Sequence, residues 1–280
     1  MDDETRVWRF LDTGANDGAF NMATDAALAR LGQNRPVLRT YTWCPPTISI
    51  GFHQRLSEID KNKCQLRGID IVRRPTGGRA IYHAHEVTYC VVVPKNDELY
   101  NKSTLEVYDI ISSALVQGLR RLDIDLALEK VQQDDADFAN TPSKSACFAT
   151  SAQYEIHVQS RKLVGSAQRR FKNGLLQHGS IMLGDDHMHL TDYLTPSCEA
   201  PTSTAHGFYH LQKELSGKTI SVERVLARTV RYEEVVSSLH AGFQQVFGVR
   251  LCPDRLTERE LRRINELIPK YSNLGGNHES

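Results

Sequence analysis

The sequence has no excess of charge of either sign. Its 280 residues include 34 lysines and arginines and 34 aspartates and glutamates, so the formal net charge at pH 7 is zero. A general nucleic-acid-binding protein carries a strongly basic surface that pairs with phosphates. The charge balance therefore excludes that class and indicates that any electrostatic recognition by this protein is local.

Long apolar runs are also missing. No stretch approaches the ~20 apolar residues that span a bilayer. The N-terminal sequence MDDETRVWRF is acidic and lacks the basic start and apolar core of a signal peptide. We therefore expect a cytoplasmic protein.

Cysteines are few, and no two are spaced for a metal or a redox pair. None of them forms the C-x-x-C spacing of zinc and dithiol sites, and a disulfide framework is not expected in a reducing compartment. We therefore expect no metal. Isolated cysteines in such a chain are usually buried and inert. The six are Cys44, Cys64, Cys90, Cys147, Cys198 and Cys252.

The first half of the chain alternates helical and strand-like segments. Asn16 and Asp17 can cap a helix that stops at Gly32, and Ser103 with Glu106 forms a capping box for a second helix. The almost continuously apolar segment 86–94 predicts a central strand covered on both faces. Strand-like segments in this half are 37–43, 47–51, 69–74 and 86–94.

The second half begins with a polar stretch, 132–145, which predicts an exposed loop, and Cys147 stands where this loop meets the next strand. Segments 161–167 and 175–183 are strand-like, and the basic stretch 168–174 between them predicts a hairpin tip. From Ser221 onward the pattern is helical. Thr257 and Glu260 cap a last helix that we expect Pro269 to end. No repeat, low-complexity tract or linker is visible. We therefore predict one α+β domain over residues 1–280, with mixed sheets flanked by helices and a helical C-terminal part from about 221 to 280.

The stretch RRPTGGRAIYH, residues 73–83, is longer and more basic than a turn between two strands requires. Adjacent glycines let the backbone approach a ligand, and arginines favour carboxylate or phosphate groups. The P-loop pattern and the G-x-G-x-x-G dinucleotide fingerprint are both absent. The residues alone fit a ligand-binding loop and a structural turn with solvated arginines about equally well.

A family resemblance favours the ligand-binding loop. Together with RRPTGGRAIYH, the segments HEVTYCVVVP, CFATSAQYEIHV, RKLVGSAQRR and LLQHGSIML resemble, in order and approximate spacing, the lipoate-protein ligase and octanoyltransferase superfamily. With the segments NMATDAAL and KYSN the resemblance covers nearly the whole chain. It implies the biotin/lipoate protein ligase-like catalytic fold. In that family the loop lines the site of the acyl chain and its activated head group.

Cys147 points to one branch of this superfamily. ATP-dependent lipoate ligases make an acyl-adenylate and need no nucleophilic cysteine, whereas CF followed by YEIHV resembles the cysteine-dependent octanoyltransferases. The resemblance implies that Cys147 is the nucleophile and that Lys162 hydrogen-bonds the acyl carbonyl or assists proton transfer. A thiol has a pKa of about 8.5, so such a site must favour the thiolate. Read without the resemblance, Lys162 is a lysine on a solvated strand edge.

The remaining candidates are expected to bind the substrate. His83 and His178 contact the acyl donor, assist as acid or base, or are hydrogen-bonded structural histidines. The backbone amides near the glycines can stabilise an oxyanion. The candidate substrate-binding residues are Arg74, Gly77, Gly78, Arg79, His83, Gly165 and His178.

Two positions depart from the family pattern. The transferases usually carry an aspartate directly after the histidine, but this chain reads His83-Ala84-His85-Glu86, which leaves any role of that acid open. The C-terminal KYSNLGGN also lacks the usual tryptophan before its asparagine, a change that we expect to affect packing.

The resemblance implies transfer of an octanoyl group from acyl carrier protein to a lysine of a lipoyl-domain protein, such as the glycine cleavage H protein or the E2 of a 2-oxoacid dehydrogenase. No cofactor is expected. Arg169, Arg170 and Lys172 are a candidate docking patch for the acidic carrier, or simply a charged hairpin tip. The alternatives are an ATP-dependent lipoate ligase, an amidotransferase that uses the same cysteine, and a non-catalytic acyl-binding or partner-binding protein.

Overall fold

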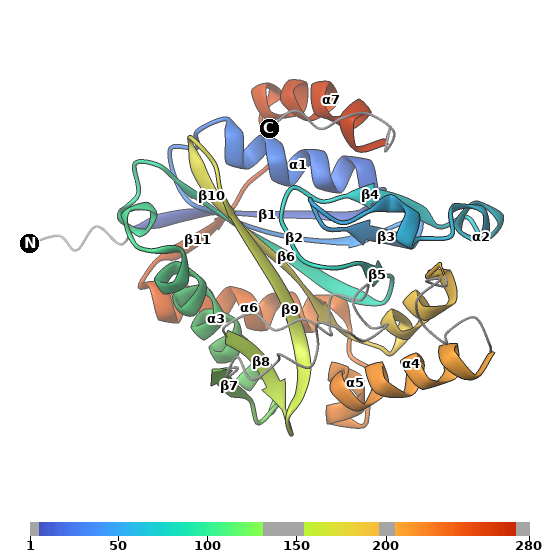
Figure 1. Ribbon diagram of the computed structural model, residues 1–280. Coiled ribbons are helices and arrows are strands. Elements are labelled where there is room, and N and C mark those ends of the chain that lie inside the picture. Colours follow the sequence, from blue (N-terminus) through green and yellow to red (C-terminus); the bar gives the residue numbers. More distant parts are fainter. Residues whose placement is uncertain (1–5, 131–153, 196–204, 273–280) are drawn as a thin grey trace, which may run out of the picture.

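The computed structural model describes residues 6–130, 154–195 and 205–272. Two sheets form its centre (Figure 1). The larger sheet has eight strands in the order β11-β1-β2-β6-β10-β9-β8-β7. Its strands are β1 (Val7–Asn16), β2 (Val37–Trp43), β6 (Glu86–Pro94), β7 (Ala127–Lys130), β8 (Tyr154–Val158), β9 (Arg161–Arg170), β10 (Gly174–Met182) and β11 (Arg250–Pro253).

The large sheet is mixed. β1 pairs in parallel with both β11 and β2, whereas the pairings from β2 through β6, β10, β9 and β8 to β7 are antiparallel. This arrangement confirms the predicted α+β class with mixed sheets. All nine residues of β6 are buried. The central position predicted for segment 86–94 from its apolar run is therefore confirmed.

A small sheet of three strands, in the order β4-β3-β5, lies beside the large one. Its strands are β3 (Thr47–Ile50), β4 (Asp70–Arg73) and β5 (Ile81–His83). Ile48, Ile50, Tyr82 and Leu190 belong to a separate apolar cluster on this sheet. The short elements of the described chain are α2 (Lys61–Leu66) and the 3-10 helices η1 (Leu56–Glu58), η2 (Glu98–Asn101) and η6 (Asp186–Tyr193).

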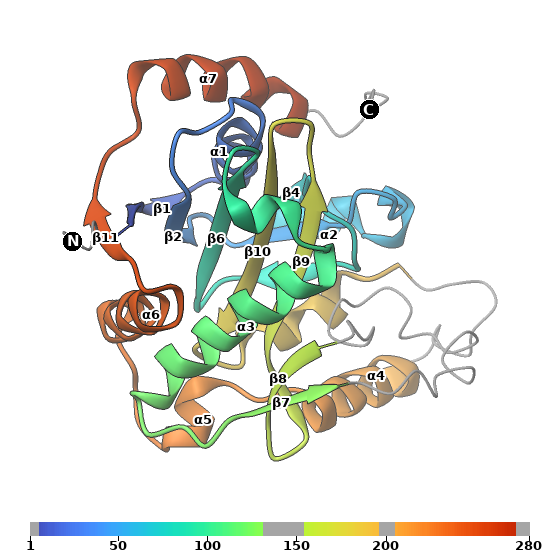
Figure 2. The same ribbon diagram turned by 90° about the vertical axis from the view of Figure 1, so that its left-hand side faces the viewer.

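Helices cover both faces of the large sheet (Figures 1 and 2). α1 (Gly18–Arg30) and α7 (Glu258–Ser272) lie together on one face, and α3 (Thr104–Arg120) and α6 (Tyr232–Phe247) lie on the other. α4 (Ala205–Lys218) and α5 (Val222–Leu226) complete the C-terminal part. The predicted cap is confirmed, because the Asp17 side chain accepts a hydrogen bond from the amide of Phe20 at 2.7 Å.

Several boundaries differ from expectation. The hairpin between β9 and β10 is confirmed, but both strands extend into segment 168–174, and the Phe171 amide donates to the Gly174 carbonyl at 2.7 Å. The C-terminal part is not purely helical, because β11 pairs with β1. β1 itself was not predicted.

Pro269 does not end the last helix. α7 continues to Ser272, with Pro269 inside it. The proline removes one amide donor near the helix end. Tyr271, which is 7% exposed, packs in the apolar cluster between α7 and α1 and holds the last turn in place. Tertiary packing thus outweighs the local stop signal. Within the described ranges, no helix is long and apolar enough to cross a membrane.

Candidate active site

A cavity lies where α1, the large sheet and the small sheet meet. Its lining comes from α1, from β2, β6, β9 and β10 of the large sheet, from β3 and β5 of the small sheet, and from Arg74 directly after β4. The lining is mostly apolar, with a few convergent polar groups, as is typical of ligand sites. Its residues are Met22, Tyr41, Trp43, Ser49, Arg74, Ile81, His83, Thr88, Gly165, Ser166, Ala167, His178, Gly179 and Ser180.

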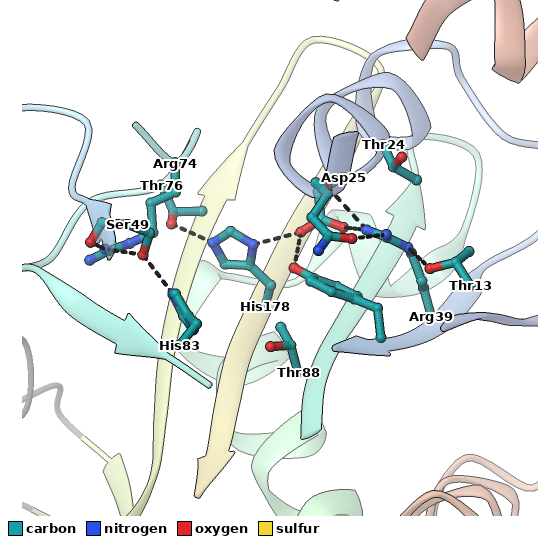
Figure 3. Close-up of polar contacts among 12 residues, drawn as sticks. Thr13, Thr24, Asp25, Arg39, Ser49, Arg74, Thr76, His83, Thr88 and His178 are labelled. Carbon is teal, nitrogen blue, oxygen red and sulfur yellow. Dashed lines mark hydrogen bonds and ion pairs between the residues drawn. The ribbon is translucent and has the colours of Figure 1, made fainter. Parts of the chain in front are cut away.

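His178, on β10, links α1 to the loop of residues 74–80 between β4 and β5, called the glycine loop below. Its Nδ1 lies 2.8 Å from Oδ2 of Asp25, and its Nε2 lies 2.7 Å from Oγ1 of Thr76 (Figure 3). The ring is 5% exposed. The imidazole therefore holds the loop residue Thr76 in a fixed position relative to the large sheet.

Asp25 belongs to a fully buried ion pair behind His178. Its Oδ1 accepts a hydrogen bond from Nη1 of Arg39 at 2.6 Å, and its Oδ2 accepts one from the Tyr41 hydroxyl at 2.9 Å. Both charged side chains are 0% exposed. Burial opposes ionisation of the carboxyl, but Arg39, His178 and Tyr41 together outweigh it and hold the pKa of Asp25 below its ordinary value of 3.8.

His83 reaches the cavity from β5 and is clamped on three sides. Its Nδ1 lies 2.9 Å from Oε1 of Glu86, and its Nε2 lies 2.8 Å from Oγ of Ser49. Its ring stacks on Trp43 with the centroids 4.1 Å apart and the planes 14° apart. The carboxylate partner of His83 is therefore Glu86, the third residue after it in the chain.

Glu86 is buried, and hydrogen-bond donors from several residues surround its carboxylate. Its carboxylate accepts hydrogen bonds from the Trp43 indole, Thr88 and Ser180 as well as facing His83. Burial raises the pKa of such a group, but His83 and the two hydroxyls prevail and hold the pKa of Glu86 below its ordinary value of 4.5. The carboxylate is thus ionised at neutral pH.

The arginines of the loop mainly organise its backbone. Arg74, 3% exposed, donates to the carbonyls of Gly77 at 3.0 Å and Arg79 at 2.6 Å, and to both the carbonyl and the hydroxyl of Ser49 at 3.1 Å. Arg73 donates to the carbonyls of three residues after β3, namely Gly51, Phe52 and Gln54. The Arg79 guanidinium lies 3.9 Å from Glu58, and Arg79 does not line the cavity. Substrate binding by Arg74 and Arg79 stays a prediction.

Gly51 and Gly78 allow a close backbone approach. Gly78 has a φ of +91°, and a Cβ on Gly51 would lie 1.9 Å from the Gly78 carbonyl oxygen. The residue after β3 and the loop before β5 can therefore touch only because Gly51 has no side chain. The oxyanion role predicted for Gly77 and Gly78 stays a prediction.

Of the predicted residues on β9, Gly165 lines the cavity and Lys162 does not. Lys162 is 5% exposed at the start of the strand, so the view that it is a solvated strand-edge residue is wrong. A buried lysine is rare and signals a specific environment. Cys147, the predicted nucleophile, lies outside the described residues, and so does Cys198.

The predicted docking patch is partly committed to internal contacts. Arg169 donates to the Pro75 carbonyl at 2.8 Å and lies over the Phe52 ring at 4.2 Å. Arg170 is exposed and donates to the carbonyls of Tyr100 and Lys102. These contacts brace the hairpin against the glycine loop and against η2. Recognition of a carrier protein by this patch stays a prediction.

Sequence reasoning did not identify the carboxylates and hydroxyls that hold the two histidines. A signal existed for Asp25 and its partner: Asp25 is the only acidic residue of α1 and Arg39 the only charged residue of β2, which indicates that the two are paired if both elements are buried. Ser49, Thr76 and Glu86 gave no such signal. In the described parts of the chain, no group of three or more His, Cys, Asp or Glu side chains could hold a metal ion.

Comparison with known proteins identifies the family. Residues 17–244 match the lipoyl protein ligase A/B catalytic domain. The chain belongs to this family. The resemblance inferred from its motifs is confirmed.

Named relatives align with nearly the whole chain. Octanoyltransferase LipM of Kyrpidia tusciae is 38% identical over 270 residues, which is 95% of this chain and 96% of the relative. Octanoyltransferase LipM of Geobacillus kaustophilus is 37% identical, with 93% and 94% covered. Octanoyltransferase LipM of Staphylococcus aureus is 34% identical, with 95% and 96% covered.

Solved structures agree on the fold. A bipartite lipoate protein ligase from Thermoplasma acidophilum superposes with a TM-score of 0.74 at 22% identity, covering 95% of this chain and 92% of that one. A lipoate-protein ligase A bound with ATP gives a TM-score of 0.73 at 22% identity, covering 95% of each chain. The predicted lipoate protein ligase-like fold is confirmed. At this identity the likeness says nothing about the reaction.

Proposed function

We propose that this protein transfers an octanoyl group from acyl carrier protein to a lysine of a lipoyl-domain protein, through an acyl thioester on Cys147, as the first step of protein lipoylation. Octanoyl transfer rests on one observation: relatives named octanoyltransferase align with almost the entire chain at 34–38% identity. The enzyme is therefore an acyltransferase. Acyl carrier protein as the donor, a lipoyl-domain lysine as the acceptor and Cys147 as the nucleophile are our proposal.

The chemistry fits the residues that the motifs single out. The Cys147 thiolate attacks the carbonyl carbon of the donor thioester, the carrier thiol leaves, and the acceptor lysine then attacks the new thioester. The first step exchanges one thioester for another, and the second converts the thioester into a more stable amide as the Cys147 thiol leaves, so neither step needs ATP. The proposed enzyme therefore uses no cofactor. Lys162 would support proton transfer or bind the acyl carbonyl, as the family resemblance implies.

The cavity supports an acyl substrate. Met22, Trp43 and Ile81 supply apolar surface for a hydrocarbon chain. The charged groups nearby are already satisfied: Asp25 pairs with Arg39, and Arg74 donates to the loop. Such a lining favours an uncharged acyl group over a phosphate, which would need free cationic donors.

The test is intact-protein mass after mixing the enzyme with octanoyl-acyl carrier protein without ATP, for wild type and Cys147→Ser. We expect the wild type to gain one octanoyl group that neutral hydroxylamine removes, and the Cys147→Ser protein to carry no hydroxylamine-labile octanoyl group. Adding a lipoyl-domain protein should discharge the wild-type adduct onto an acceptor lysine.

Three results would redirect the proposal. Acceptor modification only with ATP and free octanoate indicates a ligase. A labile adduct formed from an octanoylated lipoyl protein, but not from the carrier, indicates an amidotransferase. A protein that binds the acyl donor with no adduct and no turnover is a non-catalytic binding protein.

A further inference from the structure

A serine in the cavity stands in the geometry of an activated nucleophile. Ser49 Oγ lies 2.8 Å from Nε2 of His83, and Nδ1 of the same ring lies 2.9 Å from Oε1 of Glu86. Ser49 is 0% exposed to solvent and lines the cavity, as does His83. A hydroxyl, an imidazole and a carboxylate in this order form the arrangement that activates serine nucleophiles on unrelated folds.

The surrounding charges fix where the protons lie. The Glu86 carboxylate already accepts from Trp43, Thr88 and Ser180, so Nδ1 of His83, which faces it, is the ring nitrogen that donates, and a neutral His83 ring has its proton there. Nε2 is then an acceptor. Arg74 Nη1 donates to Ser49 Oγ at 3.1 Å, so the serine accepts from the guanidinium and gives its own proton to Nε2. Every group in this chain of contacts thus turns the Ser49 hydroxyl proton toward a base.

Arg74 also stabilises the charge that would develop on the serine. Its guanidinium is permanently positive, and its bonds to the carbonyls of Gly77 and Arg79 hold it in place before any reaction occurs. A preorganised cation in a buried site favours an alkoxide more strongly than the same cation in water. The glycine loop therefore supplies Ser49 with an electrostatic partner.

The second histidine gives an internal comparison. Thr76, His178 and Asp25 have the same order of hydroxyl, imidazole and carboxylate. Thr76, however, does not line the cavity, whereas Ser49 does. Ser49 also has the contact with Arg74. The contacts of His178 therefore anchor the glycine loop, whereas the contacts of His83 hold a hydroxyl, that of Ser49, at the cavity.

We propose that Ser49 is a second acyl acceptor of this enzyme. Ser49 Oγ attacks the carbonyl carbon of the octanoyl thioester, an O–C bond forms, and the C–S bond breaks. The serine proton passes to Nε2 of His83 and then to the departing thiolate, which leaves as a thiol. The product is an octanoyl ester on Ser49. The inference rests on the proposed function, because it requires the cavity to receive an octanoyl thioester.

The ester gives the enzyme a slow side activity. Water gives a proton to Nε2 of His83 and attacks the ester carbonyl carbon, and the bond from that carbon to Ser49 Oγ breaks. The proton then passes from Nε2 to Ser49 Oγ, so octanoic acid is released and the serine hydroxyl is restored. The net reaction is hydrolysis of the thioester donor. It should be measurable when no lipoyl-domain acceptor is present.

The test uses Cys147→Ala, which removes the proposed thiol nucleophile. The full-length protein is incubated with octanoyl-acyl carrier protein, and separately with octanoyl-coenzyme A, and its intact mass is measured before and after neutral hydroxylamine. We expect one octanoyl group that resists neutral hydroxylamine and maps to Ser49 after proteolysis. The Cys147→Ala/Ser49→Ala protein should lack it, and Cys147→Ala/Glu86→Gln should acquire it about 10²–10⁴-fold more slowly.

Ser238 provides the matched control. It is also a buried serine, but it lies on α6, does not line the cavity, and donates to the Val235 carbonyl at 2.8 Å. The Ser49 ester should persist in Cys147→Ala/Ser238→Ala. No adduct on Cys147→Ala from either donor, or an adduct that maps elsewhere, would overturn the inference. Peptide mapping decides the question even if Ser49→Ala folds poorly.

The two proposals fail separately. A wild-type protein without a labile adduct on Cys147 contradicts the proposed function, whatever happens at Ser49. A labile adduct on Cys147 in the wild type, with no ester on Cys147→Ala, leaves the transferase intact and removes only the role of Ser49.

Discussion

The buried ion pair behind the cavity gives the sharpest stability prediction. Asp25→Asn keeps the shape of the side chain but leaves Arg39 charged and 0% exposed, with an amide where its carboxylate was. Breaking a buried pair by removing one partner costs about 3–5 kcal/mol. Because each 1.4 kcal/mol is about tenfold in an equilibrium constant, the ratio of folded to unfolded protein should fall by about two to four powers of ten.

The assay is urea unfolding of wild type, Asp25→Asn and Tyr41→Phe at pH 7. Tyr41→Phe removes only the 2.9 Å hydroxyl contact with Asp25, so it should cost about 1 kcal/mol. Replacing both charges, as in Asp25→Asn/Arg39→Met, should recover much of the loss because no buried charge remains unpaired. A loss below about 1 kcal/mol for Asp25→Asn would refute the reasoning.

The same pair should respond to acid. The folded protein holds the pKa of Asp25 below its ordinary value of 3.8, so the carboxylate stabilises the fold above that pH. Its contribution is lost as the pH falls below 3.8 and through the lower pKa of the folded state. The stability difference between wild type and Asp25→Asn should therefore shrink in acid, and a difference that grows would contradict this account.

Three further predictions concern the cavity walls. Gly51→Ala places a Cβ 1.9 Å from the Gly78 carbonyl oxygen, and it should cost about 2 kcal/mol in urea unfolding and remove most of the acyl transfer. The control is Gly217→Ala at an exposed position of α4, where a Cβ would meet nothing within 4 Å, and it should be neutral or stabilise the protein by about 0.5–1 kcal/mol. Glu86→Gln should lower the free energy of unfolding by about 2–3 kcal/mol at pH 7. Because the folded protein lowers the pKa of Glu86, the difference in unfolding free energy from wild type should shrink below pH 4.5. A difference that does not change with pH would argue against an ionised Glu86. Lys162→Met, which keeps a long buried side chain, should abolish octanoyl transfer in a mass-spectrometric assay while leaving the melting temperature within a few degrees, and retained turnover would exclude Lys162 from the chemistry.

Local patterns predicted much of the secondary structure because their causes are local. Asp17 caps α1, and Ser103 with Glu106 caps α3, through hydrogen bonds within one helical turn. The apolar run of β6 predicted burial on both faces. Pro269 misled the prediction because the packing of Tyr271, a tertiary contact, keeps the last turn of α7 in place.

The sequence by itself determined the family, since its ordered motifs carry the resemblance, and it singled out His83, His178 and the Gly77–Gly78 loop. Only the tertiary structure decided how these parts work together. The partners of His178 are Asp25 and Thr76, 153 and 102 residues away in the chain, and Ser49 is 34 residues from His83. Pairing between strands and across the two sheets sets such distances, and no local pattern of residues encodes them. The roles of Ser49 and Glu86 could therefore be inferred only once the fold had brought them to the same histidine.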